Sequence, residues 1–254
     1  MKKALALILA AVMMMALAAC GGSKSGEKTL TVATSPDFPP FESLDGTKLV
    51  GIEVELVDAI AAKMGVKVEY VQIDFDSVLN GVQAGKYDLG MSGISVTDER
   101  KENALFTDPY CLAAQAIVVV EGSDIASKAD LDGKSVSVQT GTTAELFCNE
   151  NGYKVSSFAA NSDAESALVT GKVDAWVIDD LTAAEMVAVY NQNAETKLVI
   201  LDEAMTTEPY ALMTKKGNDQ LIADINKVLN DLVADGTVAK LFEKYGAPYT
   251  SPKQ

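Results

Sequence analysis

Apolar and polar residues follow two rhythms along the chain, one typical of strands and the other of helices. Before residue 100, short apolar or alternating runs predict strands at 30–33, 66–71 and 88–92. Apolar residues spaced three or four positions apart predict helices at 54–64 and 75–84 between them. This alternation predicts an α/β fold, in which a mostly parallel sheet has helices on its faces.

A second series of the same kind starts after Pro109. Strands are predicted at 135–138, 155–158 and 173–178, and helices at 144–149, 163–170, from 179 or 180 to 190, 220–234 and 238–245. The residues from Thr29 onward are enough for one large domain or two small lobes.

Two short half-repeats favour two lobes of one design. Residues 84–89 read Ala-Gly-Lys-Tyr-Asp-Leu and residues 170–175 read Thr-Gly-Lys-Val-Asp-Ala. Five positions past the aspartate lies Gly93 in the first copy and Asp179 in the second. Loops at the carboxyl ends of the two strands would face a common cleft, where open α/β sheets bind ligands. A Pro-Tyr pair at 109–110 and another at 209–210 would mark two strands that cross between the lobes.

The first 19 residues have the features of a signal peptide. Two lysines precede an uncharged apolar run at 4–16 that is short for a membrane span, and small residues lead to Cys20. This junction is similar to a bacterial lipobox, in which Cys20 becomes the lipid-modified mature N-terminus; the alternative is an ordinary signal peptide with a stray cysteine. Residues 20–28 would then be a flexible tether. We therefore expect an extracytoplasmic protein held on the membrane by lipid.

Charge and composition exclude several functions. The net charge is −15, and loss of residues 1–19 with their two lysines gives (21 − 2) − 36 = −17, which argues against nucleic-acid binding. The chain has no histidine, so histidine-based triads and histidine metal sites are excluded, and we expect no metal and no cofactor. Cys111 and Cys148 are expected to be separate buried thiols, although a disulfide stays an alternative.

The loop after the strand at 88–92 offers groups that suit a small carboxylic acid. Ser92 and Ser95 supply hydroxyls, and the Arg100 guanidinium can hold a carboxylate through two parallel hydrogen bonds. Thr97 is placed to cap the helix that would carry Arg100. The alternative is that Arg100 only pairs with a neighbouring acid on the surface.

Three further segments contribute candidates. The proline-rich stretch 35–42 is expected to be extended and stiff and to present Phe38, with Phe41 in the core. The segment 140–143 opens a helix, so its backbone N–H groups and hydroxyls favour an anion. Of Asp179 and Asp180, one can cap the following helix while the other faces the cleft.

Together these blocks resemble the extracytoplasmic solute-binding proteins of ABC importers for polar amino acids, the group that contains the glutamine-, histidine- and lysine/arginine/ornithine-binding proteins. The resemblance covers nearly all of 28–245. It rests on the ordered blocks 33–42, 51–56, 92–100, 106–110, 141–143 and 171–174 behind the lipobox.

The resemblance implies the two-lobed periplasmic-binding-protein fold of type II, with two mixed, mostly parallel sheets joined by two hinge strands. Lobe 1 would comprise 29–111 plus 210–250, and lobe 2 would comprise 112–209. It also implies a monomer that binds an L-amino acid between the lobes and delivers it to an importer permease.

Residue roles follow from the same resemblance. Arg100 would bind the ligand α-carboxylate with Ser95 and Thr143, while the Gly93 carbonyl and Asp179 would bind the α-ammonium. Phe38 would stack on the ligand side chain. The expected ligand-binding set is completed by Ser35, Asp37 and Gln139.

Departures from the family pattern leave the ligand side chain open. Ser35 stands where members selective for cationic side chains often have an aspartate, although Asp37 lies two residues on. Ile178 beside the ammonium ligand is apolar, and Cys111 replaces a frequent aromatic. The balance favours an uncharged side chain.

Two alternatives belong to other functional classes. A dehydratase-like enzyme on the same fold would need an acid or base that faces the substrate, for which Glu42 and Glu145 are the candidates. An amino-acid sensor domain is less favoured, because no apolar membrane-spanning run follows the last predicted helix. We expect a binding protein and not an enzyme.

Overall fold

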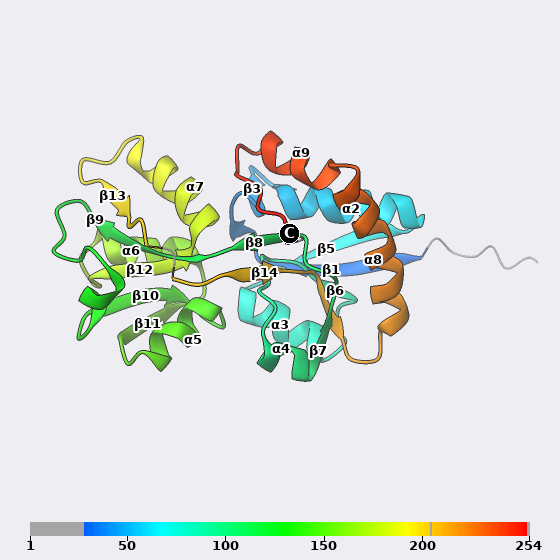
Figure 1. Ribbon diagram of the computed structural model, residues 1–254, viewed down its shortest axis with the longest axis horizontal. Helices are drawn as coiled ribbons and strands as arrows, with labels where there is room; N and C mark the ends of the chain where they lie inside the picture. The colour runs from blue at the N-terminus through cyan, green and yellow to red at the C-terminus, as the bar shows by residue number, and fades with distance from the viewer. Residues whose placement is uncertain (1–27, 204, 253–254) are drawn as a thin grey trace, which may run out of the picture.

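Two five-stranded sheets form the centres of two lobes in the computed structural model, which describes residues 28–203 and 205–252 (Figure 1). The first sheet has the order β5-β1-β6-β15-β7. Its central strand β1 is parallel to β5 and β6, whereas β15 is antiparallel to β6 and β7. These strands are β1 (Thr29–Thr34), β5 (Lys67–Gln72), β6 (Leu89–Gly90), β7 (Ala104–Phe106) and β15 (Met213–Lys215).

The second sheet has the order β11-β10-β12-β9-β13. Strand β10 is parallel to β11 and β12, and β9 is antiparallel to β12 and β13. These strands are β9 (Gln115–Val120), β10 (Ser135–Gln139), β11 (Lys154–Phe158), β12 (Ala175–Asp179) and β13 (Leu198–Ile200). Each sheet thus combines parallel strands with an antiparallel part, so both sheets are mixed, as expected.

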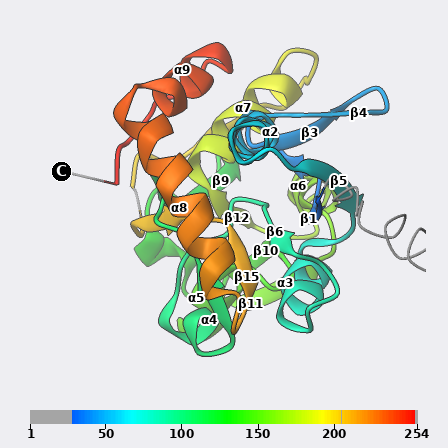
Figure 2. The ribbon, with the colours of Figure 1, turned by 90° about the vertical axis from the view of Figure 1, so that its right-hand side faces the viewer.

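Helices cover the faces of both sheets, as Figure 2 shows for the first lobe. Around the first sheet lie α2 (Ile52–Met64), α3 (Phe75–Gln83), α4 (Asp98–Asn103), α8 (Asp219–Ala234) and α9 (Thr237–Lys244). Around the second lie α5 (Thr143–Glu150), α6 (Asn161–Val169), α7 (Asp180–Asn191) and the short 3₁₀ helix η1 (Lys128–Leu131). Buried apolar side chains fill each interior, and Trp176 is completely buried.

Two strands cross between the lobes. They are β8 (Cys111–Ala113) and β14 (Glu208–Tyr210), which pair in antiparallel fashion with Tyr210 opposite Cys111 (Figure 1). The expected Pro-Tyr crossing strands are therefore confirmed. The segment around Thr250 lies beside β8, since the Leu112 amide donates to the Thr250 carbonyl at 3.0 Å.

The half-repeats have the same structural role in both lobes. Oδ2 of Asp88 accepts hydrogen bonds from the Thr31 amide and hydroxyl, both at 2.8 Å. Oδ2 of Asp174 accepts from the Ser135 amide and hydroxyl, both at 2.7 Å. Each aspartate thus ties its own strand to the neighbouring parallel strand, β1 or β10. The two strand-end loops are consequently positioned in the same way.

The proline-rich segment differs from its expected extended form. Strand β2 (Asp37–Phe38) pairs with β3 (Glu42–Asp45), and β3 pairs with β4 (Lys48–Val50). The chain turns back between β2 and β3, where the Phe41 amide donates to the Phe38 carbonyl at 3.0 Å. The prolines therefore shape a tight turn, and the expected extended loop is wrong. Phe41 is fully buried, as expected.

Cys111 and Cys148 are free and buried, which confirms the expectation of separate buried thiols. The signal peptide, Cys20 and all but the end of the tether lie outside the described residues. Within 28–203 and 205–252, none of the helices combines the length and apolar character needed to cross a membrane.

Candidate functional site

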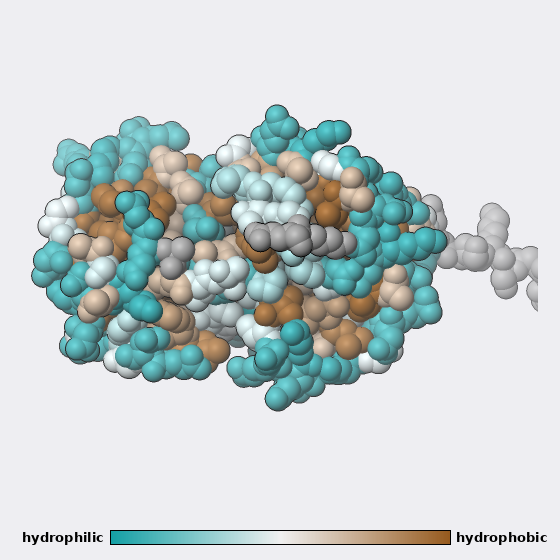
Figure 3. Space-filling view, in the orientation of Figure 1, coloured by the Kyte–Doolittle hydropathy of each residue, from teal (hydrophilic) through white to brown (hydrophobic). Residues whose placement is uncertain are grey.

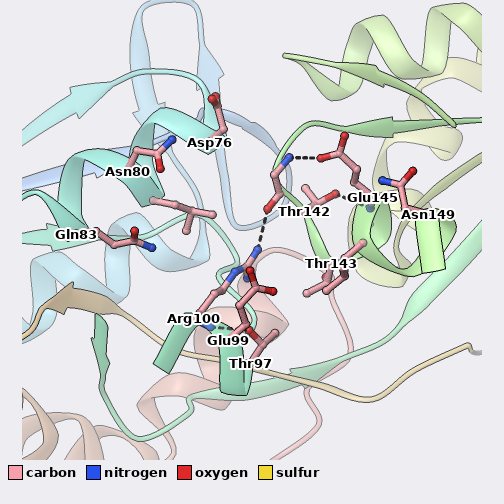
Figure 4. Close-up of a pocket in the computed structure, with 13 residues that line it drawn as sticks. Asp76, Asn80, Gln83, Thr97, Glu99, Arg100, Thr142, Thr143, Glu145 and Asn149 are labelled. Atoms are coloured by element: carbon pink, nitrogen blue, oxygen red, sulfur yellow. Dashed lines mark hydrogen bonds between the residues drawn. The ribbon is translucent and has the colours of Figure 1, made fainter. Parts of the chain in front are cut away.

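Arg100 joins the two lobes at the cleft. It lies near the start of α4, where its own amide donates to the Thr97 hydroxyl at 3.1 Å and so fixes the first turn. Its Nη1 donates to the Ser95 carbonyl at 2.8 Å within the first lobe. Its Nη2 donates to the Gly141 carbonyl of the second lobe at 3.0 Å (Figure 4). The alternative, in which Arg100 only pairs with a neighbouring acid on the surface, is therefore not what the structure shows.

The Arg100 guanidinium keeps donors for a further acceptor. Its two hydrogen bonds use two of the five N–H groups that an arginine has. Its carbon Cζ lies 5.7 Å from the centre of the Phe75 ring, which orients the planar group. Burial lowers the pKa of Arg100, and the nearby acids Glu208 and Asp179 act in the opposite direction. An ordinary arginine pKa is so high that the side chain remains a cation.

Asp179 provides the opposite charge from the second lobe. It ends β12 and is buried, and its Oδ1 accepts from Gln115 Nε2 at 2.6 Å. Burial raises the pKa of Asp179 well above its usual range, the charge of Glu208 adds to that rise, and the Tyr210 hydroxyl counters it by hydrogen bonding. Asp180 instead accepts from the Leu181 amide at 2.8 Å at the start of α7. Asp179 stands at the N-cap of α7 and lines the cavity, but it makes no side-chain capping hydrogen bond, so the expected capping acid is not found.

Glu208 is a site residue that the sequence reasoning missed. It starts the crossing strand β14, is buried, and accepts hydrogen bonds from the hydroxyls of Ser95, Thr143 and Thr206. The Thr143 bond measures 2.7 Å and joins the hinge to the first residue of α5. The repeat Thr-Asp-Pro-Tyr against Thr-Glu-Pro-Tyr was a signal that could have drawn attention to this acid.

Gly93 and Phe38 are in direct contact at the cleft. Gly93 has a φ of +54°, and a Cβ atom there would lie 2.4 Å from Cε1 of Phe38. Only glycine therefore fits beside this ring. Phe38 is buried and lies 5.7 Å from Phe41 and 6.4 Å from Tyr210 between ring centres. It belongs both to the cleft wall and to the first-lobe core.

Asp37 forms a second link between the lobes. Its Oδ1 accepts from the Ser35 hydroxyl at 3.0 Å in its own lobe. Its Oδ2 accepts from the Asn161 amide at 2.7 Å, at the start of α6 in the second lobe, and from Gln139 Nε2 at 3.3 Å. Burial raises the pKa of Asp37 although these hydrogen bonds favour its ionised form. Ser35, Asp37 and Gln139 are thus brought together, and Asn161 is a partner that the sequence reasoning missed.

One small cavity collects most of the expected ligand-binding residues. It measures about 10 Å³ and is lined by Phe38, Phe75, Ser92, Gly93, Ser95, Arg100, Gln139, Thr142, Thr143 and Asp179. This space is close to that of a single water. Beyond Arg100, a hollow of about 320 Å³ opens between α3 and α5, with Asp76, Asn80 and Asn149 on its walls (Figure 4). The space-filling view shows a notch between the lobes (Figure 3). The structure is therefore a closed form of the cleft.

A metal site is not apparent in the described part of the chain. No group of three or more acidic or cysteine side chains there is arranged to hold an ion. What the cavity offers chemically is one cation and one buried acid from opposite lobes, with hydroxyls beside the cation. This arrangement can bind a small molecule that has both an anionic and a cationic group.

Comparison with known proteins agrees with the fold. Residues 30–248 match the family model for bacterial extracellular solute-binding proteins, family 3. The chain belongs to this family. The predicted family resemblance and the two-lobed fold are thereby confirmed.

Similar family-3 binding proteins have been described in several bacteria. The chain is 34% identical over 253 residues to the arginine-binding extracellular protein ArtP of Bacillus subtilis, with 96% of this chain and 98% of the relative covered. It is 30% identical to the histidine-binding periplasmic protein of Salmonella typhimurium, with 96% of both chains covered. The solved structure of an ancestral arginine-binding protein bound to glutamine has a TM-score of 0.81 and 42% identity, covering 88% of this chain and all of that one.

The hydrogen bonds that Asp37 accepts from the second lobe lead to a prediction about cleft closure in this family-3 binding protein. Replacing Asp37 with Ala removes the acceptor of the Asn161 amide, so that amide should lose protection against hydrogen exchange. Mass spectrometry of peptides that cover the start of α6 measures this. Asp45→Ala, on the exposed part of the same hairpin, is the control. Equal protection of Asn161 in wild type and Asp37→Ala would contradict the link.

Proposed function

We propose that the protein binds an L-amino acid between its two lobes as the solute-binding component of an ABC amino-acid importer. The single observation that carries this proposal is the position of Arg100 and Asp179. They bring charges of opposite sign from opposite lobes to one buried cavity. A free amino acid has a carboxylate and an ammonium on the same α-carbon, and so complements both.

The proposed binding mode uses the donors and acceptors that face the cavity. Arg100 holds the α-carboxylate, helped by the hydroxyls of Ser95 and Thr143. The Gly93 carbonyl and Asp179 hold the α-ammonium, and Phe38 covers part of the side chain. Asp179 supports this assignment, because an ammonium beside it would offset the cost of burying its charge. The two hydroxyls now donate to Glu208, so ligand binding must rearrange this group of hydrogen bonds.

Ligand entry requires the lobes to separate. A space of about 10 Å³ is far too small for an amino acid, and the contacts from Arg100 to Gly141 and from Asp37 to Asn161 hold the cleft shut. Strands β8 and β14 connect the sheets. We infer that hinge rotation in these strands opens and closes the cleft while each sheet stays intact.

The surroundings of the candidate acids favour binding over catalysis. Glu145 accepts from the Gly141 amide at 2.7 Å and from the Ser157 hydroxyl, so it is occupied at the start of α5. Glu42 is fully buried and does not line the cavity. One similar solved structure is that of an ancestral amino-acid-binding protein described as a precursor of cyclohexadienyl dehydratase. A dehydratase activity is therefore the alternative that turnover assays should test.

Removal of the cation should abolish tight binding. We expect Arg100→Ala to weaken the best amino-acid ligand by about 3–5 kcal/mol, because it leaves the ligand carboxylate unpaired in a closed cleft. Calorimetry with a panel of the twenty amino acids measures this. Lys101→Ala is a matched control, since the neighbouring lysine is exposed and pairs with Asp98. Wild-type affinity in Arg100→Ala for every amino acid would refute the assignment.

Acidic amino acids should be rejected. The cleft contains the acids Asp37, Asp179 and Glu208 against one cation, Arg100. A glutamate side chain would add another buried negative charge, whereas the glutamine amide would not. We expect L-glutamate to bind at least about 100-fold more weakly than L-glutamine or L-arginine. Comparable affinities in a competition assay would mean that the ligand side chain lies away from these acids.

The proposed lipid anchor has its own test. Cys20 follows a signal-peptide-like segment, so Cys20→Ser should release the protein from the membrane fraction into the medium or periplasm. Fractionation of cells that express wild type, Cys20→Ser and Cys111→Ser measures this, because the buried Cys111 thiol serves as the control. Membrane retention of Cys20→Ser would count against lipidation.

A further inference from the structure

Two carboxyl groups lie buried together beneath the cleft without a cation. Glu42 begins β3, Glu53 lies in the first turn of α2, and both side chains have no exposed surface. No lysine or arginine among the described residues forms an ion pair with either of them. Two adjacent buried carboxylates cannot both be ionised at low cost, because each charge opposes the other and neither is solvated.

Each of these acids holds one residue of the loop that faces the ligand. Oε1 of Glu42 accepts from the Ser92 hydroxyl at 2.9 Å. Oε2 of Glu53 accepts from the Gly93 amide at 2.8 Å. The remaining oxygens, Oε2 of Glu42 and Oε1 of Glu53, are fully enclosed and have no further donor among the described residues. The two carboxyl groups interact with each other.

We propose that Glu42 and Glu53 form a proton-sharing pair, with the proton on Glu42, that positions the Ser92–Gly93 loop for the ligand ammonium. The part that concerns the ligand rests on the proposed function. With the proton on Glu42, that residue donates to Glu53, and each enclosed oxygen gains a partner. Glu53 then accepts from Glu42 and from the Gly93 amide, and such donors favour the ionised form of a buried carboxylate.

The pair connects the ligand loop to the hinge. Glu53 contacts the Gly93 amide, and the carbonyl of the same residue is the proposed acceptor for the ammonium. Tyr110 immediately precedes β8, and its amide donates to the Tyr210 carbonyl at 2.9 Å. A fixed negative charge at Glu53 therefore lies behind the loop and beside the start of a crossing strand. Glu42 and Glu53 are positioning residues, since they act through the loop and do not line the cavity.

The titratable groups around the pair do not supply a positive charge. Those that act on it or respond to it are Asp37 in the proline-rich segment, Tyr70 in β5, and Tyr110 and Cys111 at the hinge. All of these are acids. Burial and the charge of Glu53 raise the pKa of Glu42 well above its usual range, and burial also raises the pKa of Glu53. The native protein therefore keeps this proton to a higher pH than the unfolded chain does.

The sign of the pH effect follows from this retained proton. Its contribution to stability is complete below the unfolded glutamate pKa of about 4.3 and declines as the pH rises toward the native pKa of Glu42. Between these two pKa values, this proton should raise the unfolding equilibrium constant by up to about tenfold per pH unit. Glu42→Gln copies the protonated shape without a titratable proton. Relative to wild type, it should lose this dependence.

The test compares Glu42→Gln and Glu53→Gln with Glu243→Gln, an exposed control on α9. Chemical denaturation from pH 5 to 7 gives the unfolding constants, and calorimetry with L-arginine and L-glutamine gives the affinities. We expect Glu42→Gln to bind within about threefold of wild type, with its pH dependence reduced by up to about tenfold per unit. Glu53→Gln should bind at least about tenfold more weakly, because it removes the anion that holds the Gly93 amide.

Each arm has an outcome that would overturn the proposal. Retention of the wild-type pH dependence in Glu42→Gln means that no proton is shared. Equal affinities of Glu42→Gln and Glu53→Gln mean that the proton does not favour Glu42. Should none of the twenty amino acids bind the wild-type protein, the proposed ligand class is wrong, and the denaturation arm still decides on the proton. If Glu53→Gln does not fold, the same arm decides through Glu42→Gln.

Discussion

Arg100 and Asp179 face the same small cavity from opposite lobes, yet they are not an ion pair among the described residues. Arg100 donates to two backbone carbonyls, and Asp179 accepts from Gln115. Both charges are removed from water without a direct counter-charge, which is costly in a protein interior. A ligand that has both charges would offset this cost. Much of the surrounding architecture serves to keep these two groups facing each other.

The internal repeat explains how one chain achieves this placement twice. Asp88 and Asp174 fix equivalent strand ends in the two sheets, so each lobe presents a loop at the carboxyl end of a central strand. The crossing strands β8 and β14 then turn these ends toward each other. Glu208 starts one of these strands and accepts from hydroxyls of both lobes. The hinge therefore takes part in the polar network of the cleft, and movement of the lobes must change the partners of Ser95 and Thr143.

Much of the fold could be predicted because it depends on local patterns. The strand–helix alternation, the glycines after helices and the repeated Gly-Lys-x-Asp segment located most elements and the cleft residues Gly93, Arg100 and Asp179. Long-range features were missed. Strands β9 and β13 are antiparallel partners that a parallel pattern does not predict, and the turn between β2 and β3 depends on pairing. Phe75, Gln115, Asn161 and Glu208 became site residues only through tertiary contacts.

Small-angle X-ray scattering of the wild-type protein tests the central claim most directly. The cleft is closed around a space too small for an amino acid, so the ligand-free protein in solution must reach a more open form to bind. We predict a smaller radius of gyration at saturating amino acid than without it, while the far-ultraviolet circular dichroism spectrum stays unchanged because both sheets persist. A radius of gyration that does not change at saturating ligand would contradict capture between moving lobes.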